Sequence, residues 1–142
     1  MKFYFIVVFL SYIQSSILVN LFSNGLMVPD LVLCSYFLEL LKNGDRWGLK
    51  GVFSGSVLDI LQDSAGLYIS RQILFGLIYE IIEEKLQFPS RISKTLAYVI
   101  IATSVKLFTI LLFSFKHDWS LSPTLLILGM FLEALYVYRF CR

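Results

Sequence analysis

Six runs of mainly apolar residues, separated by short polar turns, fill almost the whole chain of 142 residues. A bilayer core about 30 Å thick needs about 20 apolar residues per helix, and each run is near that length or somewhat shorter. Hydrophobic residues make up 58% of the sequence and charged residues 15%, a balance that a small water-soluble domain could not cover with polar surface. We therefore expect an all-α integral membrane protein, with residues 1–142 forming a single transmembrane domain.

The polar turns set the bounds of about six expected transmembrane helices. A Ser-Asn-Gly turn at 23–25 ends the first run, and the charged stretch 42–46 ends the second. Pro29 falls in the first turn of the second helix, where its missing N–H costs little. The sequence leaves open whether the short second or third helix is re-entrant, which would reduce the spans to five. The expected helices are 3–22, 26–41, 47–62, 67–82, 93–115 and 121–140.

Basic residues predict which side of the membrane each turn faces. With the N-terminus inside, nine of the 12 Lys and Arg residues fall on the cytoplasmic side, and only Lys116 falls in an outer loop. Such an excess marks the cytoplasmic side, so we expect both termini in the cytoplasm and an even number of helices. The nine residues are Lys2, Lys42, Arg46, Lys50, Lys85, Arg91, Lys94, Arg139 and Arg142.

The sequence holds no recognisable catalytic, metal or cofactor site. The single histidine, His117, lies in an expected outer loop, and the glycines of residues 48–55 lack the Lys-Ser/Thr ending of a phosphate-binding loop. Cys34 and Cys141 are expected in a helix and at the cytoplasmic end, which argues against a disulfide. No alanine precedes Ala65, so we expect the first run to stay in the membrane rather than act as a cleaved signal peptide. We predict a protein that is not an enzyme and binds neither a cofactor nor nucleic acid.

The third run carries a stripe of small residues. Gly51, Gly55 and Asp59 are spaced four apart and therefore share one face of a helix, with Gly48 on nearly the same face. Small residues let a second helix backbone approach closely, which favours helix association in lipid. We interpret the glycines as a packing seam, with a ligand-lining surface as the alternative.

Asp59 needs a partner, because a carboxylate facing lipid costs about 2.5–3.5 kcal/mol. It lies five residues before the outer turn, and Arg71 lies five residues after Gly66, so both sit about 7–8 Å below the outer surface. We predict an Asp59–Arg71 ion pair, with Lys106 and Glu133 as a second candidate pair at comparable depth. Structural pairing is favoured over a polar cavity or a proton path.

Residues 28–68 carry a pattern that is typical of one family. It consists of a proline near the start of a hairpin helix, the spacing G-x-x-G-x-x-x-G-x-x-x-D, and a glycine that opens the next helix. These positions are Pro29, then Gly48, Gly51, Gly55 and Asp59, then Gly66. The pattern resembles the rod-shape-determining protein family MreD, and the chain length and all-membrane layout agree with that resemblance.

The resemblance implies a multi-pass scaffold of the bacterial cytoplasmic membrane that supports cell-shape control and sidewall peptidoglycan synthesis. The implied partners are the bitopic protein MreC and, through it, the actin-like MreB and RodA with its transpeptidase in the cell-elongation (rod) complex. Gly48, Gly51 and Gly55 would hold the helical core together, Asp59 would fix the third helix, and Gly66 would allow a tight outer turn. Arg71 is not a position that the family pattern supplies.

A second class of function remains open, a substrate-binding S component of a vitamin-type transporter. Such subunits also have six helices, a similar size and inward termini. Asp59, Asp63 and Arg71 would then line a pocket open to the outside. The first helix lacks the Ala-rich pattern with which such subunits dock their transport module. An unrelated small membrane scaffold is a third alternative.

Overall fold

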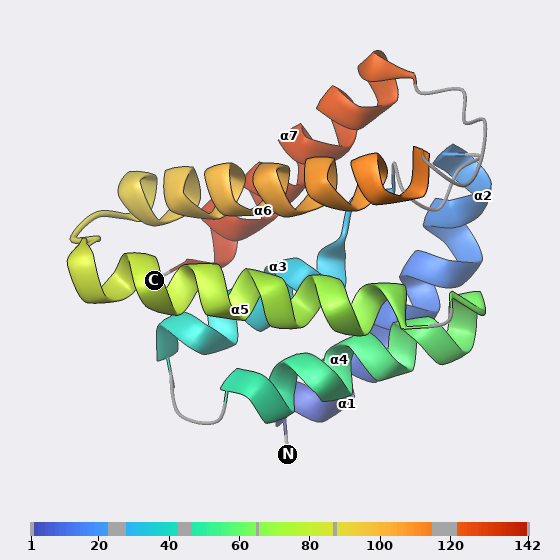
Figure 1. Cartoon of the computed structure of the whole chain (residues 1–142), viewed down its shortest axis with the longest axis horizontal. Helices are drawn as coiled ribbons and strands as arrows, with labels where there is room; N and C mark the ends of the chain where they lie inside the picture. Colours follow the sequence, from blue (N-terminus) through green and yellow to red (C-terminus); the bar gives the residue numbers. More distant parts are fainter. Residues whose placement is uncertain are drawn as a thin grey trace.

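The computed structural model describes residues 2–22, 28–42, 47–64, 66–86, 88–114 and 122–141, and the regular structure in these ranges is entirely helical. The all-α prediction is therefore confirmed for the described part of the chain. The first helix is continuous from α1 (Lys2–Ile13) through the π-helix η1 (Gln14–Leu18) to α2 (Val19–Phe22). The others are α3 (Leu31–Lys42), α4 (Trp47–Gln62), α5 (Leu67–Lys85), α6 (Arg91–Ser114) and α7 (Pro123–Phe140), as Figure 1 shows.

The start of α3 differs from the sequence prediction. The helix begins at Leu31 instead of residue 26, and residues 28–30 are not helical. Asp30 caps it, since its Oδ1 accepts the N–H of Leu33 at 2.9 Å, as an N-cap aspartate does. Pro29 therefore precedes the cap rather than lying in the first helical turn, and it disfavours a helical conformation in the residue before it. Residues 23–27, where the preceding turn was expected, lie outside the described residues.

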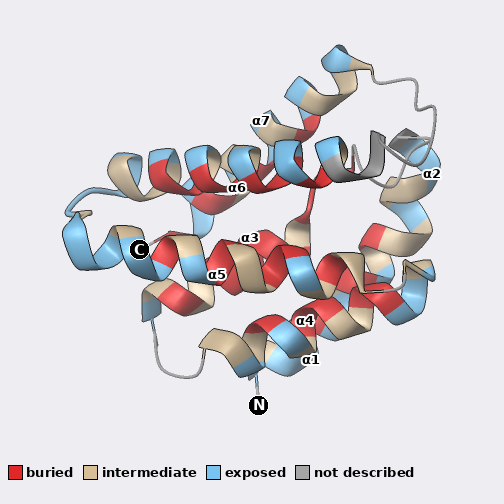
Figure 2. Cartoon of the chain, viewed as in Figure 1, coloured by how far each residue is buried: buried red, intermediate tan, exposed pale blue. Residues whose placement is uncertain are grey.

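The short helix α3 forms the centre of the molecule. It contacts α1, α4 and α7, and its Phe37 ring packs on Phe75 of α5 and Tyr98 of α6. Figure 2 shows that most of its length is buried, as expected for a helix with apolar residues on every side. Five of its side chains are fully buried: Val32, Leu33, Cys34, Tyr36 and Phe37.

The outer helices are the ones with the length and composition of membrane spans. Among the described residues, three segments qualify: Lys2–Leu21, Arg91–Leu111 and Pro123–Phe140. Their outward side chains are large and apolar, for example Phe5, Phe9 and Phe131. At 12 residues, α3 is only about 18 Å long, well short of a bilayer core of about 30 Å. The six helical segments thus include three with the character of a complete span.

Several helix ends meet at one end of the molecule, drawn on the left of Figure 1. The last turns of α3 and α5 and the first turns of α4 and α6 lie there, together with the C-terminus. Basic residues mark these turns, among them Lys42, Lys85, Arg91 and Arg139. We call this the basic end; the turn between α4 and α5 lies at the opposite end.

Candidate functional site

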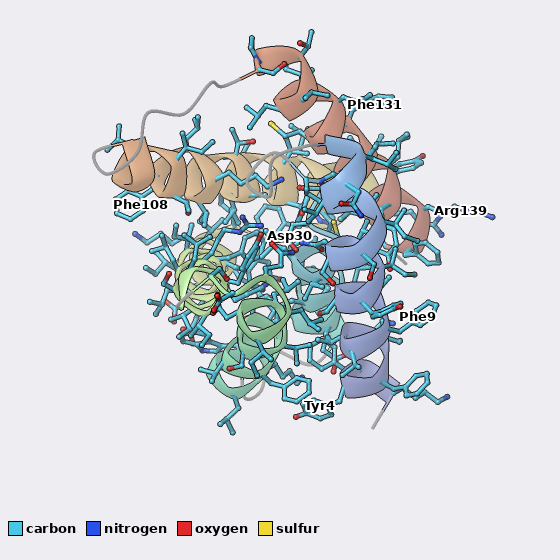
Figure 3. All side chains as sticks on the ribbon, turned by 90° about the vertical axis from the view of Figure 1, so that its right-hand side faces the viewer. Tyr4, Phe9, Asp30, Phe108, Phe131 and Arg139 are labelled. Atoms are coloured by element: carbon cyan, nitrogen blue, oxygen red, sulfur yellow. The ribbon has the colours of Figure 1, made fainter. Side chains whose placement is uncertain are left out.

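Four charged side chains meet inside the molecule at the N-terminal end of α3. Figure 3 labels one of them, Asp30, among the side chains between the helices. Asp30 precedes α3, Arg71 comes from α5, Lys106 from α6 and Glu133 from α7, and none is more than 4% exposed. Arg71 donates to Asp30 Oδ2, and Lys106 donates to Glu133 Oε1. We call these four residues the charge cluster. Its two positive and two negative groups balance, as buried charges require.

The backbone at the start of α3 joins the two ion pairs. The Asp30 N–H donates to Glu133 Oε1 at 2.6 Å, while Asp30 itself caps the helix. The first N–H groups of a helix lack partners within the helix and form the positive end of its dipole. Two carboxylates placed there satisfy these N–H groups and are stabilised by the dipole. The buried start of α3 therefore fixes where both acidic side chains lie.

A third acceptor at the start of α3 comes from an irregular turn in the first helix. Gln14 begins the π-helix η1, is 1% exposed, and receives the N–H of Val32 on its Oε1 at 3.4 Å. Single π turns within α-helices occur frequently at functional sites. The buried hydroxyl of Ser11, about one turn earlier, makes no hydrogen bond with any described residue.

Tyr98 extends the charge cluster towards the core of α3. Its hydroxyl donates to Glu133 Oε2 at 2.9 Å and lies 3.1 Å from Cys34 Sγ. Because the tyrosine proton is used on Glu133, the tyrosine oxygen can accept from the Cys34 thiol, which also lies 3.9 Å from the Glu133 carbonyl oxygen. All four carboxylate oxygens of Asp30 and Glu133 thus accept hydrogen bonds from groups of this chain. The arrangement ties α3, α5, α6 and α7 together.

The predicted Asp59–Arg71 pair is wrong. Asp59 caps α5, where its Oδ1 accepts the Tyr68 N–H and its Oδ2 accepts the Ile69 N–H, both at 3.0 Å. Similar depth did not identify the partner of Asp59, because the free N–H groups at the start of α5 use both of its carboxylate oxygens. Arg71 instead pairs with Asp30, 41 residues earlier in the chain. The second predicted pair, Lys106 with Glu133, is confirmed.

The predicted glycine seam divides into one tight contact, one close contact and one open position. A Cβ on Gly55 would lie 2.4 Å from the Ile69 Cα of α5, and one on Gly51 would lie 3.1 Å from the Tyr36 hydroxyl. Gly48 has nothing within 4 Å of such a Cβ. Gly66, the N-cap of α5, has φ +91°, a conformation that favours glycine.

Sequence reasoning missed Asp30, Tyr98 and Gly76. Asp30 had a usable signal, because an aspartate just before an apolar run is a helix-start signature. Gly76 carried no pattern, yet a Cβ there would come within 2.4 Å of the Tyr36 hydroxyl and 2.7 Å of the Trp47 ring. Tyr98 became recognisable only once the fold had placed it beside Glu133.

The charge cluster holds helices in place. Its carboxylates are saturated, although the Nε of Arg71 lacks a hydrogen-bond partner among the described residues. A pocket of about 390 Å³ lies elsewhere, between α3, α4 and α5, and is lined by none of the four charged residues. Within the described residues, no three His, Cys, Asp or Glu side chains gather as they would around a metal ion.

Comparison of the chain with protein-family models, with curated proteins and with solved structures gives no match.

Proposed function

We propose that this chain is a non-enzymatic scaffold of the MreD type in the bacterial cytoplasmic membrane. The observation that carries the proposal is the charge cluster, in which every carboxylate oxygen is bound by the chain itself. Ionisable groups inside membrane proteins usually serve a substrate path or pair with each other. Here they pair, and so they fix four helices in one arrangement. A rigid helical body of this kind presents defined faces to lipid and to a partner helix.

Membrane insertion is supported by how the polar backbone is shielded. Non-helical backbone is tolerated at membrane depth only where protein covers it. The segment before α3 meets that condition, since Val28 is 1% exposed and Asp30 is 0% exposed. We propose that all six helical segments cross the membrane, with the short α3 enclosed by its neighbours and the basic end in the cytoplasm.

The partner is proposed from the family resemblance in residues 28–68. That pattern coincides with positions that have a structural reason in this fold: Gly55 at the closest contact, Asp59 capping α5, and Gly66 with its positive φ. The partner is then MreC, whose transmembrane helix packs against an outer helix. Through MreC the chain would act with MreB and with RodA and its transpeptidase.

The geometry favours the scaffold over the transporter S component. That alternative needs Asp59 and Arg71 to line a pocket open to the outside. Arg71 is 3% exposed and donates to Asp30, and both carboxylate oxygens of Asp59 accept N–H groups at the start of α5. Neither side chain is left for a solute.

Purification of the tagged full-length chain from its native membranes in mild detergent tests the proposal. We expect mass spectrometry to identify MreC, with or without RodA, in the purified complex. The Arg71→Ala variant should lose the partner because it leaves Asp30 unpaired, whereas Glu39→Gln, which alters the partly exposed pair with Lys50, should keep it. Recovery of an ATP-binding transport module in place of MreC would contradict the scaffold.

A further inference from the structure

A pocket of about 390 Å³ opens at the basic end between the last turns of α3 and α5 and the first turn of α4. Its apolar walls include Leu40, Trp47 and Gly76. A Cβ on Gly76 would lie 2.7 Å from the Trp47 ring, so the glycine lets the indole lie directly against α5. The volume is within the range of ligand pockets, about 300–1,000 Å³. The pocket therefore offers an aromatic wall in a space large enough for a long side chain.

Three carboxylates complete the lining. Glu80, Glu83 and Glu84 come from the last two turns of α5 and are exposed. None forms an ion pair with another described residue. At spacings of three and four they face the same side, where like charges repel. They also lie near the negative end of the α5 dipole, which disfavours carboxylates. Both effects favour a cation beside these side chains.

A buried hydroxyl points to the same conclusion independently of charge. Tyr79 also lines the pocket and is 3% exposed. Its hydroxyl lies near Glu83 but makes no hydrogen bond of normal geometry with a described residue. The Tyr79 oxygen is therefore available to accept a hydrogen bond from a donor that enters the pocket.

We propose that this pocket binds an Arg or Lys side chain from the cytoplasmic segment next to the transmembrane helix of a partner protein. The proposal rests on the membrane orientation given above. Membrane proteins carry their excess of basic residues on that side of the bilayer, so a partner presents such side chains at this level. The carboxylates match the charge, and Trp47 provides a face for a cation–π contact.

A binding measurement with a defined probe tests the pocket on its own. The full-length protein is placed in phosphatidylcholine nanodiscs, and a fluorescein-labelled peptide of alternating Arg and Ser is titrated in. We expect the E80Q/E83Q/E84Q variant to bind at least about tenfold more weakly, because three charge contacts are lost. D63N, which removes an acid at the opposite end, should bind like the unmodified chain, and a peptide with citrulline in place of Arg should not bind.

Equal binding by E80Q/E83Q/E84Q and the unmodified chain would overturn the proposal, as would equal binding of the citrulline peptide. Because the three glutamates are exposed and repel one another, their replacement should not lower the melting temperature, which verifies that the variant is folded. The neutral lipid removes attraction between the peptide and the membrane surface.

Carbodiimide treatment of native membranes tests the nature of the partner, since the reagent joins carboxylates to neighbouring lysine amines. We expect cross-links from residues 80–84 to a lysine directly beside the transmembrane helix of a different protein. Cross-links only to a second copy of this chain would contradict the proposal. If the peptide binds and such cross-links form but MreC is never recovered, the pocket stands and the MreD-type function fails. If E80Q/E83Q/E84Q retains MreC and binds the peptide normally, the pocket proposal fails and the MreD-type function stands.

Discussion

Asp30 carries three structural roles at one position. Its side chain caps α3 through Leu33 and pairs with Arg71, and its backbone N–H binds Glu133. The capping role needs only an oxygen acceptor, whereas the pairing role needs a negative charge. The two contributions can therefore be separated by a substitution that keeps the oxygen and removes the charge.

Asp30→Asn should lower the free energy of unfolding by about 3–5 kcal/mol, because it leaves the Arg71 charge buried without a counter-charge. Asparagine remains a good helix cap, so loss of the cap does not contribute. The matched control is Glu39→Gln. It breaks the Lys50–Glu39 pair, whose side chains are 12% and 20% exposed, and should cost less than about 1 kcal/mol. Denaturation of the purified variants in one detergent measures both, and equal losses would contradict a buried cluster.

A double-mutant cycle separates the two possible partners of Arg71. Asp59→Ala should cost about 1–2 kcal/mol through the lost cap of α5, and this cost should add to that of Arg71→Ala within about 0.5 kcal/mol. Asp30→Ala and Arg71→Ala should instead show a coupling above that limit, since each removes the other's partner. Coupling of Asp59 rather than Asp30 to Arg71 would restore the pair predicted from sequence.

At the scale of helices, the predicted bounds held wherever a polar turn interrupts the apolar pattern. For α4 the expected range 47–62 coincides with the helix, and for α5 to α7 the ends differ by a few residues. The start of α3 was missed because Val28 and Pro29 continue the apolar pattern, and hydropathy does not detect a cap. The partner of Arg71 was missed because depth gives the height of a residue but not its direction around the helix. The capping signal of Asp30 would have corrected the first error, whereas the second needs the helix rotations that packing sets.

The glycine stripe shows the same limit. Periodicity places Gly48, Gly51 and Gly55 on one face, but helix packing decides which of them touches a neighbour. Gly55→Ala should be strongly destabilising, because its Cβ would lie 2.4 Å from the Ile69 backbone, which cannot yield as a flexible side chain does. Gly48→Ala should be neutral or stabilising by up to about 1 kcal/mol, since alanine is the better helix former and the space is open.

Thermal unfolding of the two alanine variants, with Gly51→Ala as an intermediate case, checks this order. Gly51 faces the Tyr36 hydroxyl at 3.1 Å, and that hydroxyl donates to the Trp47 carbonyl at 3.0 Å. A small shift of the tyrosine would relieve the contact at the expense of this hydrogen bond. A melting temperature for Gly55→Ala at or above that of Gly48→Ala would exclude the tight α4–α5 contact.

At the scale of the whole molecule, the exposed apolar side chains of the outer helices should face lipid. Phe9 in α1, Phe131 in α7 and Leu86 after α5 have almost the same exposure, at 57%, 59% and 57%. Each is replaced by cysteine in a chain whose Cys34 and Cys141 are changed to serine. We expect a membrane-impermeant maleimide to label only Leu86→Cys, and only in inside-out vesicles, since the bilayer covers the other two.

After the vesicles are dissolved in a denaturing detergent all three cysteines should react, which shows that each is chemically available. Labelling of Phe9→Cys or Phe131→Cys in sealed vesicles at the rate of Leu86→Cys would mean that the outer helices meet water. Labelling of Leu86→Cys from the outside would reverse the proposed orientation.

The long sequence separation within the charge cluster has a consequence for synthesis. Asp30 and its acceptor Glu133 are 103 residues apart, so the ribosome has made most of the chain before α3 can be completed. Until α7 emerges, the nascent protein holds a short helix whose first N–H lacks its acceptor and a Lys106 without its counter-charge. The earlier helices can therefore make these contacts only after α7 has been synthesised. On the proposed placement in the membrane, a chain that stops before Glu133 would leave Lys106 without its counter-charge inside the bilayer.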